Sequence, residues 1–320
     1  MNTSVKGIVF VVLLGICGIC GIYNLWEMPD MTSWGLNFME KYKEIDCEKR
    51  IVNQQDEQWF LRHFQKSIPP FLSRNYNVSQ EAFSWWTKLQ ANPKNFDLKL
   101  FSETTQKIFE GIPAHPPVAE TNPDHCRTCA VVGNSVNLKR SHYGKLIDQH
   151  ESVFRINLGM TNGFEKDVGT KTTHRVIYPE SMGARLDNTT HLVFFPFKLK
   201  DLNWLAYWVT PGTVRVNNPI KRKDLVLMAN PAFMRYIHLS WLQGKGQYSS
   251  TGFMTVILAL HICDEVSVFG FGADSDGNWS HYWEPLYDKH LRTGPHPGSL
   301  ELNLIEELAR RGKLVFYRGF

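Results

Sequence analysis

The sequence predicts an α/β domain whose mostly parallel β-sheet is flanked by helices. Two observations lead to this prediction. From residue 129 onward, short apolar runs that suit buried strands alternate with longer amphipathic stretches, and polar turns with glycine or asparagine follow several of the runs. Strands that alternate with helices form parallel sheets, and ligands bind beyond the carboxyl ends of such strands. We therefore expect the binding residues in the turns that follow the strands.

Each expected element rests on the spacing of its apolar residues. Strands are short apolar runs, and we expect them within residues 131–132, 153–157, 191–197, 224–230, 265–271 and 313–317. Amphipathic stretches predict helices at 138–150, 231–242, 251–262 and 299–311. Residues 58–109 have helical spacing in places, whereas the proline-rich residues 112–125 are expected to form a loop.

The amino terminus predicts a membrane anchor. Residues 7–23 contain no charge, and residues 7–26 reach roughly the 20 residues needed to cross a bilayer. Lys6 suits a short cytoplasmic tail at residues 1–6. A cleaved signal peptide is the alternative, although no A-x-A-like cleavage site is present. We expect an uncleaved signal anchor, a stem at residues 27–46 and a lumenal domain at residues 47–320.

The composition of the 320-residue chain argues against one class of partner. With 43% hydrophobic residues, the chain can build a sizeable core. Its formal net charge is only +4, and no block of Lys and Arg stands out. Because basic blocks are the usual sequence sign of nucleic-acid binding, we expect no nucleic acid partner.

The cysteines suggest an oxidising compartment. Outside the apolar segment there are four, an even set that predicts two disulfides: Cys47, Cys126, Cys129 and Cys263. The sequence alone allows three connectivities. Cys126 and Cys129 form a CxxC pair, but a zinc site would need a second pair of His or Cys residues. A redox role is disfavoured because no thioredoxin-like context surrounds the pair.

Three N-x-S/T triplets lie past the apolar segment, at Asn77, Asn188 and Asn278. Such triplets often arise by chance, so each is a weak sign of glycosylation. Asn278 stands among candidate site residues, which makes its modification the least expected of the three.

Two turns could hold a phosphate or a sugar. Gly133-Asn134-Ser135 lacks the G-x-G-x-x-G pattern of dinucleotide sites, but Asn134 offers amide donors without charge. The alternative is a turn that asparagine stabilises. Ser249 to Gly252 precede a strongly apolar helix, whose first backbone N–H groups could bind an anion. The alternative there is an ordinary helix N-cap.

An acidic turn and two histidines complete the candidates. Asp274 and Asp276 match the Asp-x-Asp pair with which many glycosyltransferases hold a divalent ion and a sugar nucleotide. The glycine and asparagine around them favour a solvated turn instead. His281 and His296 lie in loops that contain glycine or proline. An accessible imidazole in such a loop can act as acid or base near neutral pH.

Together these segments resemble the animal sialyltransferase family. Residues 129–157 and 163–181 resemble its large sialylmotif, and residues 248–274 resemble its small sialylmotif. The HYWE sequence at 281–284 resembles its third motif, and His296 with Glu301 resembles its H-x4-E motif. All four motifs occur in the family's order, over roughly residues 47–320. The residues of these motifs are most similar to those of β-galactoside α2,3-sialyltransferases that act on Galβ1-3GalNAc.

The resemblance implies a single-pass type II enzyme of the Golgi membrane with a GT-A-like (Rossmann-like) fold and a lumenal catalytic domain. Such an enzyme transfers N-acetylneuraminate from CMP-Neu5Ac, with inversion, to the 3-hydroxyl of a terminal galactose. The acceptors are galactose-terminated glycans on glycoproteins or glycolipids. No metal or other cofactor is implied.

The resemblance also implies roles for individual residues. The catalytic matches are His296, as general base, and His281, which stabilises the departing phosphate. The donor-binding matches are Asn134, Asn157, Tyr178, Ser250, Thr251, Gly252 and Gly272. The acceptor-binding matches are Gln90, Tyr248 and Trp279. The implied disulfides are Cys129–Cys263, which joins the two sialylmotifs, and Cys47–Cys126.

Two features depart from the family pattern. Val136 replaces the usual glycine of the large motif, and the segment 211–224 is shorter than in relatives and lacks their acceptor-facing tyrosine. Two other hypotheses remain: a metal-dependent transferase that uses a UDP-sugar with Asp274 and Asp276, and a catalytically inactive Golgi lectin.

Overall fold

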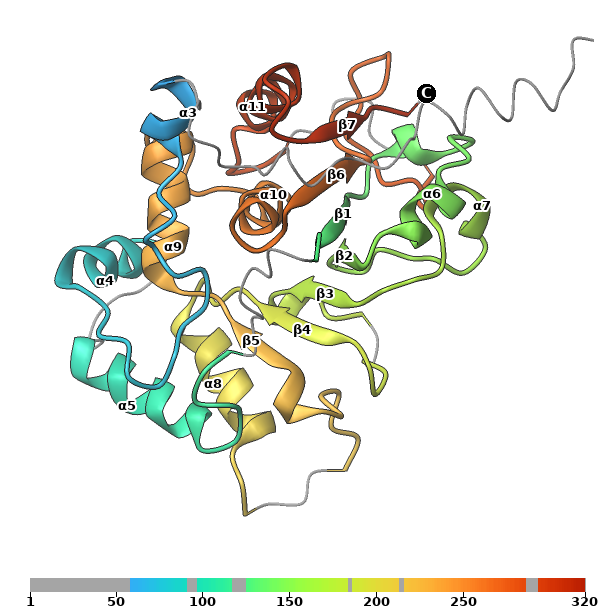
Figure 1. Cartoon of the computed structure of the whole chain (residues 1–320). Coiled ribbons are helices and arrows are strands. Elements are labelled where there is room, and N and C mark those ends of the chain that lie inside the picture. The colour runs from blue at the N-terminus through green and yellow to red at the C-terminus, as the bar shows by residue number, and fades with distance from the viewer. Residues whose placement is uncertain are drawn as a thin grey trace, which may run out of the picture. The chain divides into compact units, whose positions relative to one another are not determined.

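The computed structural model describes residues 58–90, 97–116, 125–183, 186–212, 216–285 and 293–319. Within this part of the chain, seven strands form one sheet in which all neighbours are parallel, in the order β5-β4-β3-β2-β1-β6-β7 (Figure 1). The strands are β1 Thr128–Val132, β2 Ser152–Ile156, β3 His174–Ile177, β4 His191–Phe194, β5 Val226–Met228, β6 Glu265–Phe269 and β7 Val315–Tyr317. The predicted α/β class with a parallel sheet is confirmed.

Helices cover both faces of the sheet (Figure 1). One face packs against α3 Gln58–His63, α9 Pro231–Tyr236, α10 Thr251–Ile262 and α11 Gly298–Arg310. The other face packs against α6 Gly144–Gln149 and α7 Glu165–Val168 over β1 and β2, and against α8 Leu199–Val209 over β4 and β5. Helix α5 Leu98–Phe109 packs against α8, and α4 Gln80–Thr87 packs against α9. One turn of π-helix, Ile237–Trp241, extends α9.

Helix α10 has the bounds that the sequence predicts. Ser250 is its N-cap, and the Ser250 side chain accepts a hydrogen bond from the backbone N–H of Phe253. Nine of its twelve residues are buried, because the helix is apolar on all sides and lies across the sheet. A cap followed by a long apolar run is a strong local signal, which explains the agreement.

Strand β3 and helices α7 and α8 were not expected from the sequence. Strand β3 has only four residues, and His174 and Arg175 interrupt the apolar pattern of a buried strand. Helix α8 has no Ser, Thr, Asn or Asp at its N-cap position, which is Lys198. Asp201, inside the first turn, accepts hydrogen bonds from the backbone N–H groups of Phe197 and Lys198 instead. The usual start signal is therefore shifted into the helix.

The strand order creates one point at which the chain reverses direction across the sheet. From β1 the chain proceeds through β2, β3 and β4 to β5, and it then returns to place β6 on the other side of β1. The loops after β1 and β6 therefore leave the sheet side by side at its carboxyl edge. Ligands of open α/β sheets bind at such switch points.

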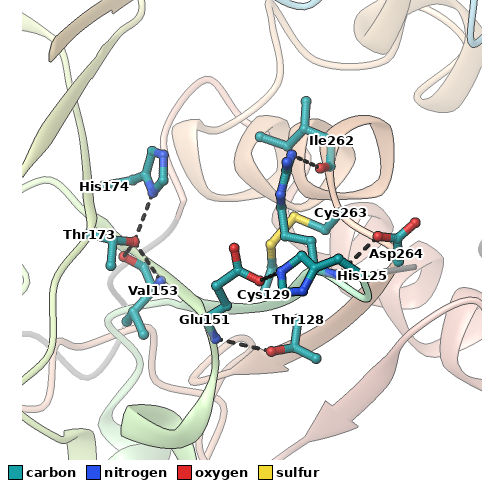
Figure 2. The surroundings of a disulfide bond; sticks show 11 residues. His125, Thr128, Cys129, Glu151, Val153, Thr173, His174, Ile262, Cys263 and Asp264 are labelled. Carbon is teal, nitrogen blue, oxygen red and sulfur yellow. Dashed lines mark hydrogen bonds and ion pairs between the residues drawn. A yellow bond between two sulfur atoms is a disulfide. The ribbon is translucent and has the colours of Figure 1, made fainter. Parts of the chain in front are cut away.

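A disulfide at the amino end of β1 joins this strand to the end of α10, just before β6. Cys129 in β1 is bonded to Cys263, which directly follows α10, with a sequence separation of 134 residues. Figure 2 shows that hydrogen bonds surround this bond, among them one from the backbone N–H of Glu151 to Thr128 at 3.0 Å. The expected Cys129–Cys263 pair is confirmed. Cys126 is also disulfide-bonded, and its expected partner Cys47 lies outside the described residues.

The expected anchor at residues 7–26 and the stem at 27–46 also lie outside the described residues. Among the helices that the structure describes, none is both long enough and apolar enough to cross a membrane.

Candidate active site

A cavity of about 360 Å³ opens at the carboxyl edge of β1, β2 and β6, at the switch point of the sheet. Its walls come from the loops after β1 and β6, the start of α10, the start of α11 and the loop at 279–281. Seven of the predicted site residues line it: Asn134, Ser250, Gly252, Gly272, Trp279, His281 and His296. Asn134 and His296, which are 162 positions apart in the sequence, therefore line one cavity at the carboxyl ends of the strands.

Close backbone contact joins the two loops that leave the sheet here. A side chain at Gly133 would place its Cβ 2.3 Å from the carbonyl oxygen of Gly270, so only glycine fits at this position. Gly270 itself has φ 69°, a left-handed conformation that glycine adopts without strain. The loops after β1 and β6 thus form a single wall of the cavity.

An asparagine follows the end of each of the strands β1 and β2: Asn134 after β1 and Asn157 after β2. Asn134 donates from Nδ2 to the carbonyl oxygen of Ile156, at 3.1 Å. Its Oδ1 and the Oδ1 of Asn157 are both buried and have no hydrogen-bond partner among the described residues. Asn157 lines a neighbouring polar cavity of about 290 Å³. Because a buried acceptor without a partner is costly, both amides are suited to receive a hydrogen bond from a ligand or water.

The start of α10 is held by a carboxylate from α11. Glu301 is 6% exposed, and it accepts hydrogen bonds from the backbone N–H of Ser250, at 2.7 Å, and from the Ser250 hydroxyl, at 2.6 Å. Burial raises the pKa of Glu301. Ser250 is thus an N-cap that also lines the cavity. The next N–H groups, of Thr251 and Gly252, have no hydrogen-bond partner among the described residues, so they remain available to an anion.

His296 is held in one tautomer. Its Nδ1 lies 3.1 Å from the carbonyl oxygen of Tyr248, and its ring packs edge-on against the Tyr248 ring, with centroids 4.8 Å apart. A carbonyl can only accept, so Nδ1 carries the proton and Nε2 is left as an acceptor. Burial lowers the pKa of His296, which keeps the ring neutral near pH 7. A neutral imidazole with a free Nε2 is the form that a general base requires.

His281 is held beside the loop after β1. Ser135 and His281 pair as an antiparallel bridge, and the backbone N–H of Tyr282 donates to the Asn134 carbonyl at 3.0 Å. The His281 ring stacks on Trp283, and its Nδ1 lies 2.7 Å from a carboxylate oxygen of Glu284. The carboxylate fixes the proton on Nδ1 and turns the other edge of the ring away from Glu284.

The remaining predicted residues lie at the side of β3 and β4. The rings of Tyr178 and Tyr248 both pack against Phe197, with centroids 5.7 Å and 5.1 Å away. Gln90 uses its side-chain amide on the backbone: Nε2 donates to the carbonyl of Phe197 at 2.9 Å, and Oε1 accepts from the N–H of Leu199 at 2.9 Å. Gln90 thus binds the backbone of Phe197, whose ring packs against both tyrosines. The predicted role of Gln90 in acceptor binding stays a prediction.

Comparisons with known proteins agree with this geometry. Residues 71–313 match the model of glycosyltransferase family 29 (sialyltransferase). A chicken (Gallus gallus) protein named CMP-N-acetylneuraminate-beta-galactosamide-alpha-2,3-sialyltransferase 1 is 44% identical over 289 residues, which cover 87% of this chain and 83% of the relative. The pig (Sus scrofa) protein of the same name is 41% identical, with the same coverage. This chain belongs to the sialyltransferases of glycosyltransferase family 29.

A solved structure shows the same fold. It is a mammalian sialyltransferase in complex with Gal-beta-1-3GalNAc-ortho-nitrophenol, with a TM-score of 0.75 and 39% sequence identity. The match covers 86% of this chain and 99% of the solved chain. The sialyltransferase resemblance that the sequence predicts is therefore confirmed.

The acidic turn of this sialyltransferase uses Asp274 internally. Oδ1 of Asp274 accepts from the backbone N–H groups of Asp276, at 3.0 Å, and Asn278, at 2.8 Å. The side-chain amide of Asn278, which is 3% exposed, donates to both Asp274 oxygens. Within the described residues, no three His, Cys, Asp or Glu side chains are grouped as metal ligands would be. The carboxylate of Asp274 thus closes a turn.

Sequence reasoning missed two carboxylates that shape the site. Glu301 was visible only as the last residue of the H-x4-E motif, and nothing in that spacing shows that it binds Ser250. Asp201 is 0% exposed and holds the backbone beside Gln90, but in the sequence it is one acidic residue in an aromatic stretch. Such contacts join distant segments, so local pattern could not reveal them.

Proposed function

We propose that this protein is a β-galactoside α2,3-sialyltransferase, which transfers N-acetylneuraminate from CMP-Neu5Ac to the 3-hydroxyl of a terminal galactose. Membership of family 29 and the names of the relatives support this reaction. The single structural observation that carries the proposal is His296, a half-buried neutral imidazole with a free Nε2 in the cavity at the switch point.

The proposed reaction is one inverting displacement. The galactose 3-oxygen forms a bond to the anomeric carbon of the sialyl group, and its proton passes to Nε2 of His296. The bond from the anomeric carbon to the phosphate oxygen breaks, and its electron pair leaves with CMP. His281, in the same cavity, interacts with the phosphate on which negative charge grows. The N–H groups of Thr251 and Gly252, at the positive N-terminal end of α10, stabilise the same negative charge.

The proposal includes no metal ion. A CMP leaving group has one phosphate, whose charge is smaller than that of the diphosphate of a UDP-sugar. Histidine and backbone N–H groups are suited to stabilise it. Asp274, which a metal-dependent UDP-sugar transferase would need, is already engaged by the turn at 274–278.

We assign Galβ1-3GalNAc as the preferred acceptor, on glycoproteins or glycolipids. The names of the relatives and the acceptor in the solved structure support this choice. Trp279 lines the cavity, and Tyr248 contacts the base, so both stand where an acceptor sugar would approach His296. The proposed cell location is the Golgi membrane, with residues 7–26 as a type II anchor and a lumenal, GT-A-like catalytic domain.

The decisive experiment offers CMP-Neu5Ac and UDP-galactose, with and without EDTA, to a panel of galactosides, and determines the linkage of each product. We expect α2,3-linked sialic acid on Galβ1-3GalNAc, with a rate that EDTA does not change. Transfer from UDP-galactose that EDTA abolishes would support the metal-dependent alternative. Acceptor binding without turnover would indicate a lectin. A higher kcat/KM for Galβ1-4GlcNAc would contradict the acceptor assignment.

A further inference from the structure

Two side chains hold the connection between β4 and α8, residues 195–198, from opposite sides. Oδ2 of Asp201 accepts hydrogen bonds from the backbone N–H groups of Phe197 and Lys198, both at 2.9 Å. Gln90, in the turn after α4, donates from Nε2 to the Phe197 carbonyl and accepts at Oε1 from the Leu199 N–H, both at 2.9 Å. Both backbone polar groups of Phe197 are therefore fixed by side chains.

Asp201 is an expensive residue for this position. It is 0% exposed, and its Oδ1 is buried without a hydrogen-bond partner among the described residues. Burial raises the pKa of Asp201 to about 6. A buried carboxylate costs free energy, which its hydrogen bonds only partly return. What the buried Asp201 carboxyl provides in return is the fixed backbone of Phe197 and Lys198.

Phe197 is the side chain that the fixed connection presents. Its ring lies at 90° to the Tyr178 ring, 5.7 Å away, and 5.1 Å from the Tyr248 ring. Tyr248 in turn has its ring 4.8 Å from the His296 ring, and its carbonyl accepts from Nδ1 of His296. An unbroken series of contacts thus runs from Asp201 through Phe197 and Tyr248 to the proposed base.

We propose that Asp201 and Gln90 are positioning residues for catalysis: they fix Phe197, which holds Tyr248 and, through Tyr248, the ring of His296. This inference rests on the proposed function, because it assigns a purpose to the surroundings of the proposed base. It gives Gln90 a role through the backbone, since its side-chain amide already has a backbone partner at each end.

The surroundings of His296 make pH a suitable probe. His296 is half-buried, and its partial burial lowers its pKa. Loss of the Phe197 ring would let more water reach Tyr248 and the imidazole, which raises the pKa of His296 toward its ordinary value of about 6.5. Other titratable groups are nearby: Asp201 and Glu180 act electrostatically on Tyr248, and Glu301 and His281 line the same cavity as His296. The test therefore needs a variant that removes only the ring contact.

Phe197→Leu is that variant, and Phe195→Leu is its matched control. Phe195 is also fully buried and lies two residues earlier, but it has no ring contact with Tyr178 or Tyr248 among the described residues. Both variants should lower the melting temperature. Only Phe197→Leu should lower kcat, by about tenfold or more, because small displacements of a catalytic group are costly.

The pH dependence gives the sharper readout. An imidazole with a pKa of about 6.5 is about one quarter unprotonated at pH 6.0 and about nine-tenths unprotonated at pH 7.5. The ratio of kcat/KM at pH 6.0 to that at pH 7.5 should therefore fall up to about fourfold in Phe197→Leu and stay unchanged in Phe195→Leu. Asp201→Ala should behave like Phe197→Leu. Asp201→Asn, which keeps an oxygen acceptor, should restore most of kcat.

Each outcome decides a question. If the wild-type protein transfers no sialic acid, the proposed function fails, whatever the variants do. If the wild type is active and Phe197→Leu loses stability with an unchanged pH ratio, the positioning role is refuted. The same conclusion follows if Asp201→Asn and Asp201→Ala are equally impaired. Should Asp201→Ala fail to fold, Asp201→Asn and the two phenylalanine variants still decide the matter.

Discussion

Removal of the Cys129–Cys263 disulfide should lower stability strongly and leave catalysis nearly intact. The bond closes a loop with a sequence separation of 134 residues. In the chain-entropy model, a loop of this length restricts the unfolded chain by about 17 cal/mol/K, or about 5 kcal/mol at 25 °C. Cys129 is 0% exposed and Cys263 is 7% exposed, so replacement by alanine also leaves space in the core. We expect the double alanine variant to lose about 5 kcal/mol of unfolding free energy.

Urea unfolding followed by tryptophan fluorescence would measure this loss. The single variant Cys263→Ala is the control: it also lacks the cross-link but retains Cys129, so it should lose nearly as much. The KM for CMP-Neu5Ac should stay within about twofold, because the bond lies at the amino end of β1 and the cavity lies at the carboxyl end. A loss below about 1 kcal/mol would refute the loop argument. Normal stability with lost CMP binding would show that the bond shapes the site directly.

Three further outcomes follow from the site. His296→Ala should lower kcat by roughly 10²–10⁴-fold with CMP affinity retained in calorimetric titration; near-normal turnover would end the general-base assignment. Glu301→Gln should weaken its two bonds to Ser250, cost about 1–3 kcal/mol in urea unfolding and raise the KM for CMP-Neu5Ac; an unchanged KM would argue against its role at α10. Burial raises the pKa of Asp201 to about 6, above its unfolded value, so this carboxyl stabilises the fold most below pH 4 and loses that contribution as the pH rises through 6. The difference in unfolding free energy between wild type and Asp201→Asn should therefore change by about 2 kcal/mol between pH 4 and 7, and a constant difference would contradict the shifted pKa.

The sequence predicted the sheet better than it predicted the contacts between its loops. Helix α10 was found with its bounds because a serine cap and a long apolar run are local signals. Strand β3 was missed because His174 and Arg175 break the apolar run, although both lie within a parallel ladder. Helix α8 was missed because its cap is Asp201, inside the first turn. Neither failure reflects weak structure; in both cases tertiary contacts override local propensity.

The site residues likewise divide into those that local sequence signals predict and those that depend on contacts between distant segments. The rule that ligands bind at the carboxyl ends of parallel strands predicted Asn134 and Asn157 as site residues. The start of α10 and the loop at His281 were joined to them only through the resemblance to sialyltransferases. The proton on Nδ1 of His296 could not be predicted, because it depends on a carbonyl that is 48 residues away in sequence. The bond from Ser250 to Glu301 spans 51 residues and was invisible for the same reason.

The proposed lumenal location gives the buried amide of Asn278 a consequence for biosynthesis. Asn278 is the acceptor of an N-x-S triplet, yet its side-chain nitrogen binds Asp274 and is hidden from solvent. An oligosaccharide joined to that nitrogen could not be accommodated in the closed turn. In a lumenal chain, glycan transfer and folding would compete for the same atom, and each molecule that receives a glycan there would be unable to close the turn. The active population would then consist of chains that folded first, with sugar permitted only at the exposed Asn77 and Asn188.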